Sequence, residues 1–158
     1  MNTEEEPMEN GNTSWTQSVT GVLIRENKVL LVRHTYGAGN GMLIVPGGYI
    51  NQGEMPQEAL IREYLEETGV LIKPLELIAV RFNTKDWYAA FRAEYVSGAA
   101  VSDNDENSEA LWLDVHKALI REDVPDLTKK LIECSLTRKG LSPIEYNGKN
   151  PPYQLFGV

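Results

Sequence analysis

The sequence contains a single cysteine, Cys134, among its 158 residues. An internal disulfide needs two cysteines, so a disulfide-stapled fold is excluded, and a chain of this length buries enough apolar surface to fold without one. No apolar run approaches the roughly 20 residues that a helix needs to span a bilayer. The amino terminus is acidic and polar, unlike the basic start of a secretory signal. We therefore expect a cytoplasmic protein with no membrane partner.

Basic residues are also in deficit. Fifteen Lys and Arg stand against 23 Asp and Glu, which gives a net charge of −8. Proteins that grip a nucleic acid backbone need a surplus of Lys and Arg, so we expect no nucleic acid partner. A small phosphorylated substrate remains compatible, because a bound divalent metal ion reverses the sign of the local electrostatic field. A homodimer is also compatible with the sequence and is left open.

Composition divides the chain into three parts. Residues 1–15 are rich in Glu, Asn and Gly and predict a disordered acidic tail, whereas residues 141–158, with three prolines, predict an irregular C-terminal tail. Between them we expect one domain, over residues 16–140. Its apolar patterns predict strands over 18–24, 28–34, 43–45, 75–82, 87–96 and 111–113, and helices over 55–68, 115–121 and 125–138. Strands outnumber helices, so the expected class is α/β, a mixed sheet with helices packed against it.

The predicted helix over 55–68 has two unlike faces. Glu63, Glu66 and Glu67 fall within an arc roughly 100° wide at 100° per residue, opposite a set of apolar residues. Like charges on adjacent turns cost about a few tenths of a kcal/mol per pair. A hard divalent cation such as Mg²⁺ removes that cost and prefers oxygen ligands. Taken alone, the acidic arc is explained either by a solvated helix face or by a metal site.

Together with Gly48 and Glu54 before the helix and Gly69 after it, the acidic arc matches a longer pattern. The segment resembles the Nudix box of Nudix hydrolases, G-x5-E-x7-R-E-U-x-E-E-x-G-U, where U is a bulky apolar residue. This chain supplies the specified positions as Gly48, Glu54, Arg62, Glu63, Tyr64, Glu66, Glu67, Gly69 and Val70. Tyr64 departs from the aliphatic residue that is usual there, at a position expected to face the core. The resemblance implies a Nudix-type α/β/α sandwich.

The resemblance also implies roles for individual residues. Glu63 and Glu67 would be the main carboxylate ligands of Mg²⁺ or Mn²⁺, and Glu66 would be a further ligand or the base that activates water. The Gly47 carbonyl would be a backbone ligand, while Arg62 and Glu54 would orient the glutamates. Members of the family often recruit another glutamate from outside the box. Glu109 is our preferred candidate here and Glu106 the second, with a solvated loop acid as the alternative for each.

The activity that the resemblance implies is metal-dependent hydrolysis of a pyrophosphate bond in a nucleoside diphosphate linked to another group, such as ADP-ribose, a nucleotide sugar or a dinucleoside polyphosphate. One alternative is a house-cleaning nucleoside triphosphate pyrophosphohydrolase, and another is a module that binds a nucleotide without cleaving it. Trp87 and Tyr88 offer flat surfaces for a nucleobase, although alternating strand packing explains them equally well. Arg33, Arg81 and Arg92 are candidates for phosphate contacts, with plain surface positions as the alternative.

Overall fold

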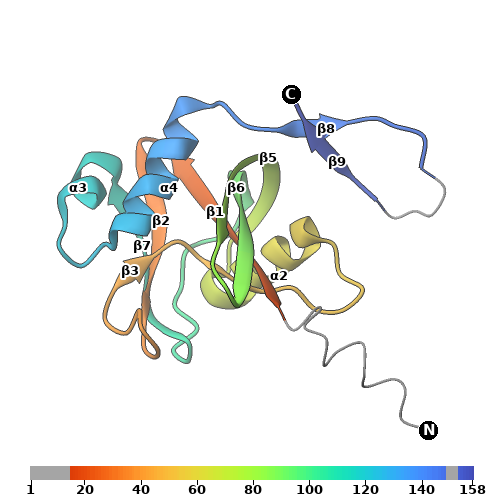
Figure 1. The fold of residues 1–158 in the computed structure, drawn as a ribbon. Coiled ribbons are helices and arrows are strands. Elements are labelled where there is room, and N and C mark those ends of the chain that lie inside the picture. Colours follow the sequence, from red (N-terminus) through yellow and green to blue (C-terminus); the bar gives the residue numbers. More distant parts are fainter. Residues whose placement is uncertain (1–14, 149–152) are drawn as a thin grey trace, which may run out of the picture.

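The computed structural model describes residues 15–148 and 153–158, and Figure 1 shows their arrangement. The expected acidic tail, residues 1–15, lies outside the described residues except for its last position. The strands are β1 (Thr16–Arg25), β2 (Lys28–His34), β3 (Leu43–Ile44), β4 (Gly47–Tyr49), β5 (Leu71–Phe82), β6 (Asp86–Ser97), β7 (Asn107–Asp114), β8 (Ser142–Ile144) and β9 (Leu155–Gly157). The helices are α2 (Pro56–Thr68), α3 (Val115–Ile120) and α4 (Asp126–Thr137).

The main sheet is mixed, which confirms the expected class. Its strands follow the order β3-β2-β1-β6-β5, with β4 paired to β1 and β7 paired to β2. Strand β1 runs parallel to β6 and antiparallel to β2 and β4. The pairing of β4 with β1 places Gly48, the first residue of the motif, and Gly47 before it directly beside the centre of the sheet.

Helices cover both faces of the sheet, with α2 on one face and α3 and α4 on the other (Figure 1). The sequence of β1 explains this, because successive side chains of a strand point to opposite faces. Val19 and Leu23 pack with Leu60 of α2, whereas Val22, of opposite parity, packs with Leu131 of α4. Two apolar clusters therefore share one buried strand, which is why β1 is apolar on both faces.

Tyr64 explains how α2 sits so close to β1. Its side chain is fully buried, and its hydroxyl donates a hydrogen bond of 2.7 Å to the Gly21 carbonyl. A Cβ atom at Gly21 would come within 2.9 Å of the Leu60 side chain. The aromatic residue at this motif position is thus a core residue with a satisfied polar end, as expected for a position away from the chemistry.

The C-terminal segment differs from the expected irregular tail. Strands β8 and β9 form a two-stranded antiparallel sheet, and Phe156 packs edge-to-face on Phe91 of the core with ring centroids 5.5 Å apart. Pro143 is accommodated because this short sheet has only edge strands, where a missing N–H group is tolerated. Among the described residues, no helix has both the length and the apolar character needed to cross a membrane.

Candidate metal centre and adjoining cavity

Local sequence fixes both ends of α2. The helix begins at Pro56, and the Glu58 carboxylate accepts a hydrogen bond of 3.1 Å from the backbone N–H of Met55. It ends at Gly69, which adopts φ 74°, a left-handed conformation that glycine takes without strain. Between these ends, Leu60 and Tyr64 pack into the core against β1, which fixes the rotation of the helix and so the direction of its glutamates.

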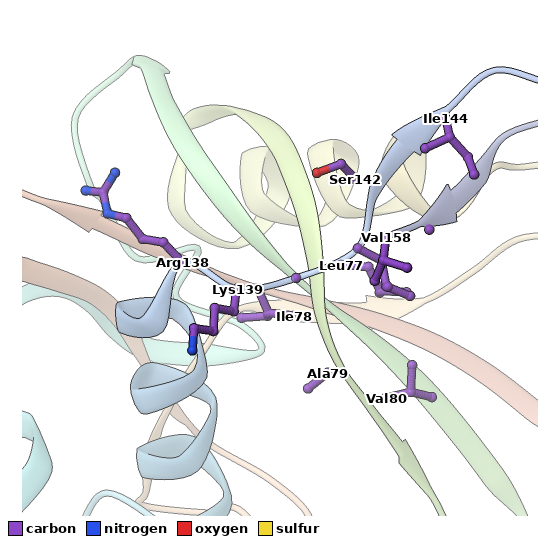
Figure 2. A pocket seen from close by; sticks show the side chains of 12 residues that line it. Leu77, Ile78, Ala79, Val80, Arg138, Lys139, Ser142, Ile144 and Val158 are labelled. Atoms are coloured by element: carbon purple, nitrogen blue, oxygen red, sulfur yellow. The ribbon is translucent and has the colours of Figure 1, made fainter.

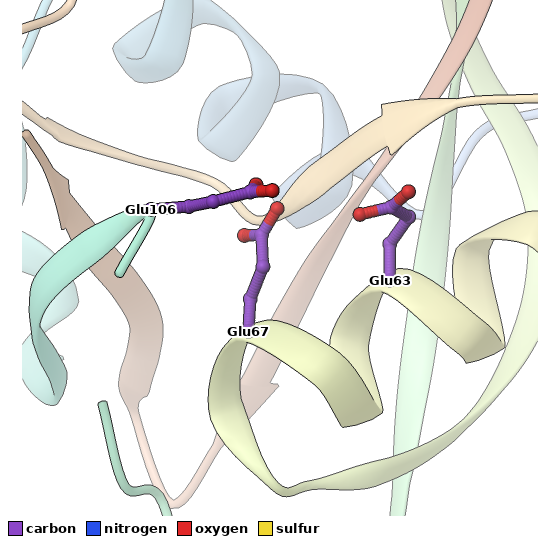
Figure 3. Close-up of side chains that lie close together, drawn as sticks. All are labelled: Glu63, Glu67 and Glu106. Carbon is purple, nitrogen blue, oxygen red and sulfur yellow. The ribbon is translucent and has the colours of Figure 1, made fainter. Parts of the chain in front are cut away.

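Three carboxylates from two distant segments converge beside this helix. Glu63 and Glu67 project from successive turns of α2, and Glu106 reaches them from the loop before β7 (Figure 3). One carboxylate oxygen from each lies within 4.8 Å of the others. An uncompensated cluster of three anions is unfavourable, whereas carboxylate oxygens are the ligands that Mg²⁺ and similar hard cations prefer. We name Glu63, Glu67 and Glu106 the carboxylate cluster.

Glu67 is the most unusual member of the carboxylate cluster. The residue is only 3% exposed, and its Oε2 atom has no hydrogen-bond partner among the described residues. Burial, reinforced by the charges of Glu63 and Glu106, raises the pKa of Glu67 to about 9. A buried and unpartnered carboxylate oxygen destabilises a protein unless a cation compensates it. The residues present therefore fit a divalent cation at this position.

Arg62 holds the neighbouring acids in place. Its guanidinium donates hydrogen bonds of 2.8 and 2.9 Å to the Glu54 carboxylate and one of 2.8 Å to Glu63 Oε1. A fourth, of 3.0 Å, goes to the backbone carbonyl of Tyr49. The hydrogen bonds from Arg62 hold the pKa of Glu54 at about 2, whereas burial raises that of Glu63. Arg62 therefore fixes the orientation of the Glu63 carboxylate. Its planar guanidinium suits the pair of hydrogen bonds to Glu54.

The two glycines of β4 are required by close approach. A Cβ atom on Gly48 would overlap the carboxylate of Glu63, and one on Gly47 would overlap the backbone carbonyl of Val19. Because neither residue has a side chain, the backbone of β4 can lie directly against both the Glu63 carboxylate and strand β1. This placement is compatible with the role that the resemblance implies for the Gly47 carbonyl, which stays a prediction.

Glu106 reaches the carboxylate cluster because neighbouring residues anchor its loop. The side-chain amide of Asn107, a buried residue, donates a hydrogen bond of 2.9 Å to the Glu67 carbonyl at the end of α2. The backbone N–H of Thr35 donates one of 3.2 Å to the Glu106 carbonyl. Asn107 is thus a positioning residue that the sequence analysis missed, since no spacing rule distinguishes it from the polar residues around it.

Two other candidate residues lie outside the carboxylate cluster. Glu109, on β7, lies opposite Arg33 of β2 and forms an ion pair of 2.7 Å with it. Glu66 is on α2 with its side chain 59% exposed, and its nearest cation is Arg62 at 3.4 Å. The geometry therefore favours Glu106 over Glu109 as the glutamate from outside the box. The three arginines considered for phosphate contacts are each paired with a carboxylate: Arg33 with Glu109, Arg81 with Asp86 and Arg92 with Glu76.

The raised pKa of Glu67 predicts an unusual pH dependence of stability. Without metal, the folded protein keeps a proton on Glu67 up to about pH 9, whereas glutamate in the unfolded chain loses it near about pH 4.3. The folded state binds more protons in that window, so its stability falls as pH rises. In EDTA we expect a loss of about 3 kcal/mol, or roughly 5–11 °C in Tm, from about pH 6 to about pH 8.

Thermal unfolding of the wild type and of Glu67→Gln, with EDTA and with Mg²⁺, measures this effect. The variant in EDTA should show a much weaker decline, and Mg²⁺ should raise the wild-type Tm most at high pH, because a metal ligand must be deprotonated. A wild-type Tm that rises steadily over the same window in EDTA would contradict the assignment.

A cavity of about 420 Å³ is lined in part by Gly47 and Gly48, and the Glu63 carboxylate lies against Gly48. Its lining includes Gly47, Gly48 and Tyr49 of β4, the face of β1 and β6 beyond them, and the start of α4. A larger cavity, of about 710 Å³, lies between β5 and the segment that follows α4 (Figure 2). Its lining contains no Asp or Glu side chain. The smaller cavity is the better candidate for a substrate site, because Gly48, which lines it, lies against the Glu63 carboxylate.

Comparison with known proteins agrees with this geometry. The NUDIX domain model matches residues 15–133, most of the chain, so the chain belongs to the Nudix family. Among solved structures, a NUDIX hydrolase from Nitrosomonas europaea superimposes with a TM-score of 0.71 at 23% identity, covering 80% of this chain and 91% of that one. Members of the family generally need a divalent metal ion, and the carboxylate cluster supplies ligands for one.

Two curated relatives are similar over shorter stretches. An ADP-ribose pyrophosphatase from Methanocaldococcus jannaschii is 36% identical over 63 residues, which are 40% of this chain and 37% of the relative. An NAD-capped RNA hydrolase NudC from Salmonella heidelberg is 36% identical over 94 residues, 56% of this chain and 35% of the relative. The chain thus matches little more than a third of the length of either relative.

Proposed function

We propose that this domain is a Mg²⁺-dependent pyrophosphohydrolase that acts on a nucleoside diphosphate linked to another group, of the ADP-ribose type. The observation that carries the proposal is the buried, unpartnered Oε2 atom of Glu67 within the carboxylate cluster, beside a cavity large enough for a nucleotide. That combination suits a cation together with the diphosphate that the cation would neutralise.

Each residue has a defined task in this proposal. Glu63, Glu67 and Glu106, with the Gly47 carbonyl, would hold Mg²⁺ or Mn²⁺. The bound metal would neutralise the diphosphate and lower the pKa of the attacking water. Arg62, itself fixed by Glu54, keeps the Glu63 carboxylate aimed at the metal position.

In this proposal Glu66, which belongs to the Nudix box but lies outside the carboxylate cluster, is the proton acceptor. Water attacks one phosphorus atom of the P–O–P bridge, the bridging P–O bond breaks, and Glu66 takes the water proton. The exposed carboxylate of Glu66 is free to exchange that proton with solvent. For ADP-ribose the two products would be AMP and ribose 5-phosphate.

The names of the relatives support this substrate class. One of them is an ADP-ribose pyrophosphatase, and a structure of an ADP-ribose pyrophosphatase from Streptococcus suis shares the fold with a TM-score of 0.62 at 15% identity. Another relative acts on NAD-capped RNA. For this chain, the net charge of −8 favours a small nucleotide over RNA as the substrate. The absence of a nucleic acid partner stays a prediction.

A substrate panel tests the proposal. Purified protein is incubated with ADP-ribose, a nucleotide sugar or ATP, each with Mg²⁺, with Mn²⁺ or with EDTA, and the products are identified by chromatography. We expect AMP and ribose 5-phosphate from ADP-ribose with either metal and no turnover in EDTA.

Two other outcomes would contradict the proposal, and each would favour a different function. Release of pyrophosphate from ATP at a higher kcat/KM would favour a nucleoside triphosphate pyrophosphohydrolase. Tight binding of ADP-ribose without any product would favour a binding module instead.

A further inference from the structure

One tyrosine lies near both the cavity of about 420 Å³ and the carboxylate cluster. Tyr36 belongs to the loop between β2 and β3, lines this cavity and is 54% exposed. Partial burial raises the pKa of its hydroxyl, and the charges of Glu106 and Glu67 raise it further. Charges act strongly on a group only over short distances, so the hydroxyl lies near these two members of the carboxylate cluster. The hydroxyl also keeps its proton at neutral pH and is therefore a hydrogen-bond donor.

The backbone before Tyr36 is tied to the loop that carries Glu106. His34, the last residue of β2, pairs with Asn107, the first residue of β7. Beyond this pair, the Thr35 hydroxyl donates a hydrogen bond of 2.8 Å to the Asp105 carbonyl, and the Thr35 N–H group donates one of 3.2 Å to the Glu106 carbonyl. Tyr36 follows directly in the chain. The contacts that position Glu106 therefore also position Tyr36.

The ring of Tyr36 is held by its neighbour two residues earlier. It stacks on the half-buried imidazole of His34, with ring centroids 5.4 Å apart and planes 16° apart. The loop closes behind this stack, because the Gly41 N–H group donates a hydrogen bond of 2.8 Å to the His34 carbonyl. Arg33 in turn donates one of 2.9 Å to the Gly41 carbonyl. A ring that is already ordered loses less conformational entropy when its hydroxyl binds a ligand.

Positively charged side chains are scarce around this hydroxyl. Among the described residues that line the cavity, Arg81 is the one Arg or Lys side chain, and its Nη2 atom is 2.9 Å from Asp86 Oδ1. Arg62 is engaged with the acids of the box, including Glu63. A diphosphate bound to a metal ion still has charged oxygens to satisfy, and a neutral donor forms strong hydrogen bonds with such oxygens. Tyr36 offers such a donor.

We propose that Tyr36 is a binding residue for the diphosphate, with its hydroxyl donating a hydrogen bond to a non-bridging phosphate oxygen between the metal position and the cavity. His34 is a positioning residue that acts through its stack on the Tyr36 ring. This inference rests on the proposed function for its choice of ligand.

Inorganic pyrophosphate tests this contact without any need for turnover. Isothermal titration of the protein with pyrophosphate, in the presence of Mg²⁺, measures the affinity for a bare diphosphate. Tyr36→Phe should bind pyrophosphate about tenfold more weakly than the wild type or worse, the usual scale for loss of a hydrogen bond to a charged group. The affinity for Mn²⁺ alone, measured by electron paramagnetic resonance, should stay unchanged, because the hydroxyl contacts the diphosphate and not the metal ion.

Variants of His34 separate positioning from a general structural role. His34→Leu removes the flat partner of the Tyr36 ring and should weaken pyrophosphate binding a few-fold, whereas His34→Phe keeps a flat partner and should retain the affinity. In a Tyr36→Phe background, His34→Leu should have no further effect, because the hydroxyl that it positions is already absent. An equal loss from His34→Leu in both backgrounds would remove the positioning role.

Tyr146→Phe is the matched control, because Tyr146 is a half-exposed tyrosine outside the cavity lining, and circular dichroism checks that each variant is folded. Unchanged pyrophosphate affinity in folded Tyr36→Phe, an equal fall in its Mn²⁺ affinity, or no binding of pyrophosphate by the wild type would overturn the inference. If ADP-ribose is not hydrolysed but pyrophosphate affinity depends on the Tyr36 hydroxyl, the proposed function fails and this inference stands. Hydrolysis of ADP-ribose with no dependence of pyrophosphate affinity on Tyr36 gives the reverse result.

Discussion

Glu67→Gln is expected to lower kcat for the preferred substrate by about 10³-fold, the scale of loss when a preorganised electrostatic group is removed from a transition state. The amide keeps the shape of the side chain and removes the charge that a cation needs. The affinity for Mg²⁺ should fall as well, because the carboxylate cluster loses its most buried member. Steady-state kinetics over a range of Mg²⁺ concentrations measures both effects.

The fold should survive this substitution. In metal-free protein at alkaline pH we expect Glu67→Gln to be more stable than the wild type, because the variant removes a carboxylate whose ionised form is disfavoured by burial. Glu133→Gln on the exposed side of α4 is the matched control and should change neither activity nor Tm measurably. Equal kcat in Glu67→Gln and the wild type would remove Glu67 from the metal centre.

The second large effect is a difference in kcat between variants of Glu106 and Glu109, two glutamates that are three residues apart. Glu106→Gln should lower kcat by about 10²-fold or more, because it would remove one of the three proposed metal ligands. Glu109→Gln should change kcat only a few-fold, since Glu109 is engaged with Arg33 at the surface. Parallel kinetics of the two variants, with metal affinity from titration, makes the comparison.

The opposite order of effects would reverse the assignment. If Glu109→Gln loses activity and Glu106→Gln does not, then the loop before β7 takes a different arrangement during catalysis. Equal and small effects in both variants would show that Glu63, Glu67 and backbone oxygens suffice to hold the metal.

Local rules in the sequence were enough to predict α2 and its functional face. A proline at the start and a glycine at the end fix its limits, and the helical period then places Glu63 and Glu67 on one side and Tyr64 on the other. The six predicted strands agree with β1, β2, β3, β5, β6 and β7 to within four positions at each end, whereas β4 was not predicted. These features depend only on neighbours in the chain.

Features that depend on distant pairing were not predictable. Nothing in the local pattern distinguishes Glu106 from Glu109, because strand pairing places Glu109 opposite Arg33, whereas the loop of Glu106 is held by contacts with distant residues. The C-terminal sheet was missed because its prolines are typical of irregular chain, whereas contact with the core orders it.

The central claim, a divalent cation held by the carboxylate cluster, is tested most directly by a crystal structure of the protein grown with Mn²⁺. We expect an anomalous difference peak within ligand distance of the Glu67 carboxylate, with Glu63 and Glu106 also in contact. Well-ordered side chains at all three positions with no peak between them, in crystals that contain Mn²⁺, would contradict the metal centre and the hydrolysis proposed from it.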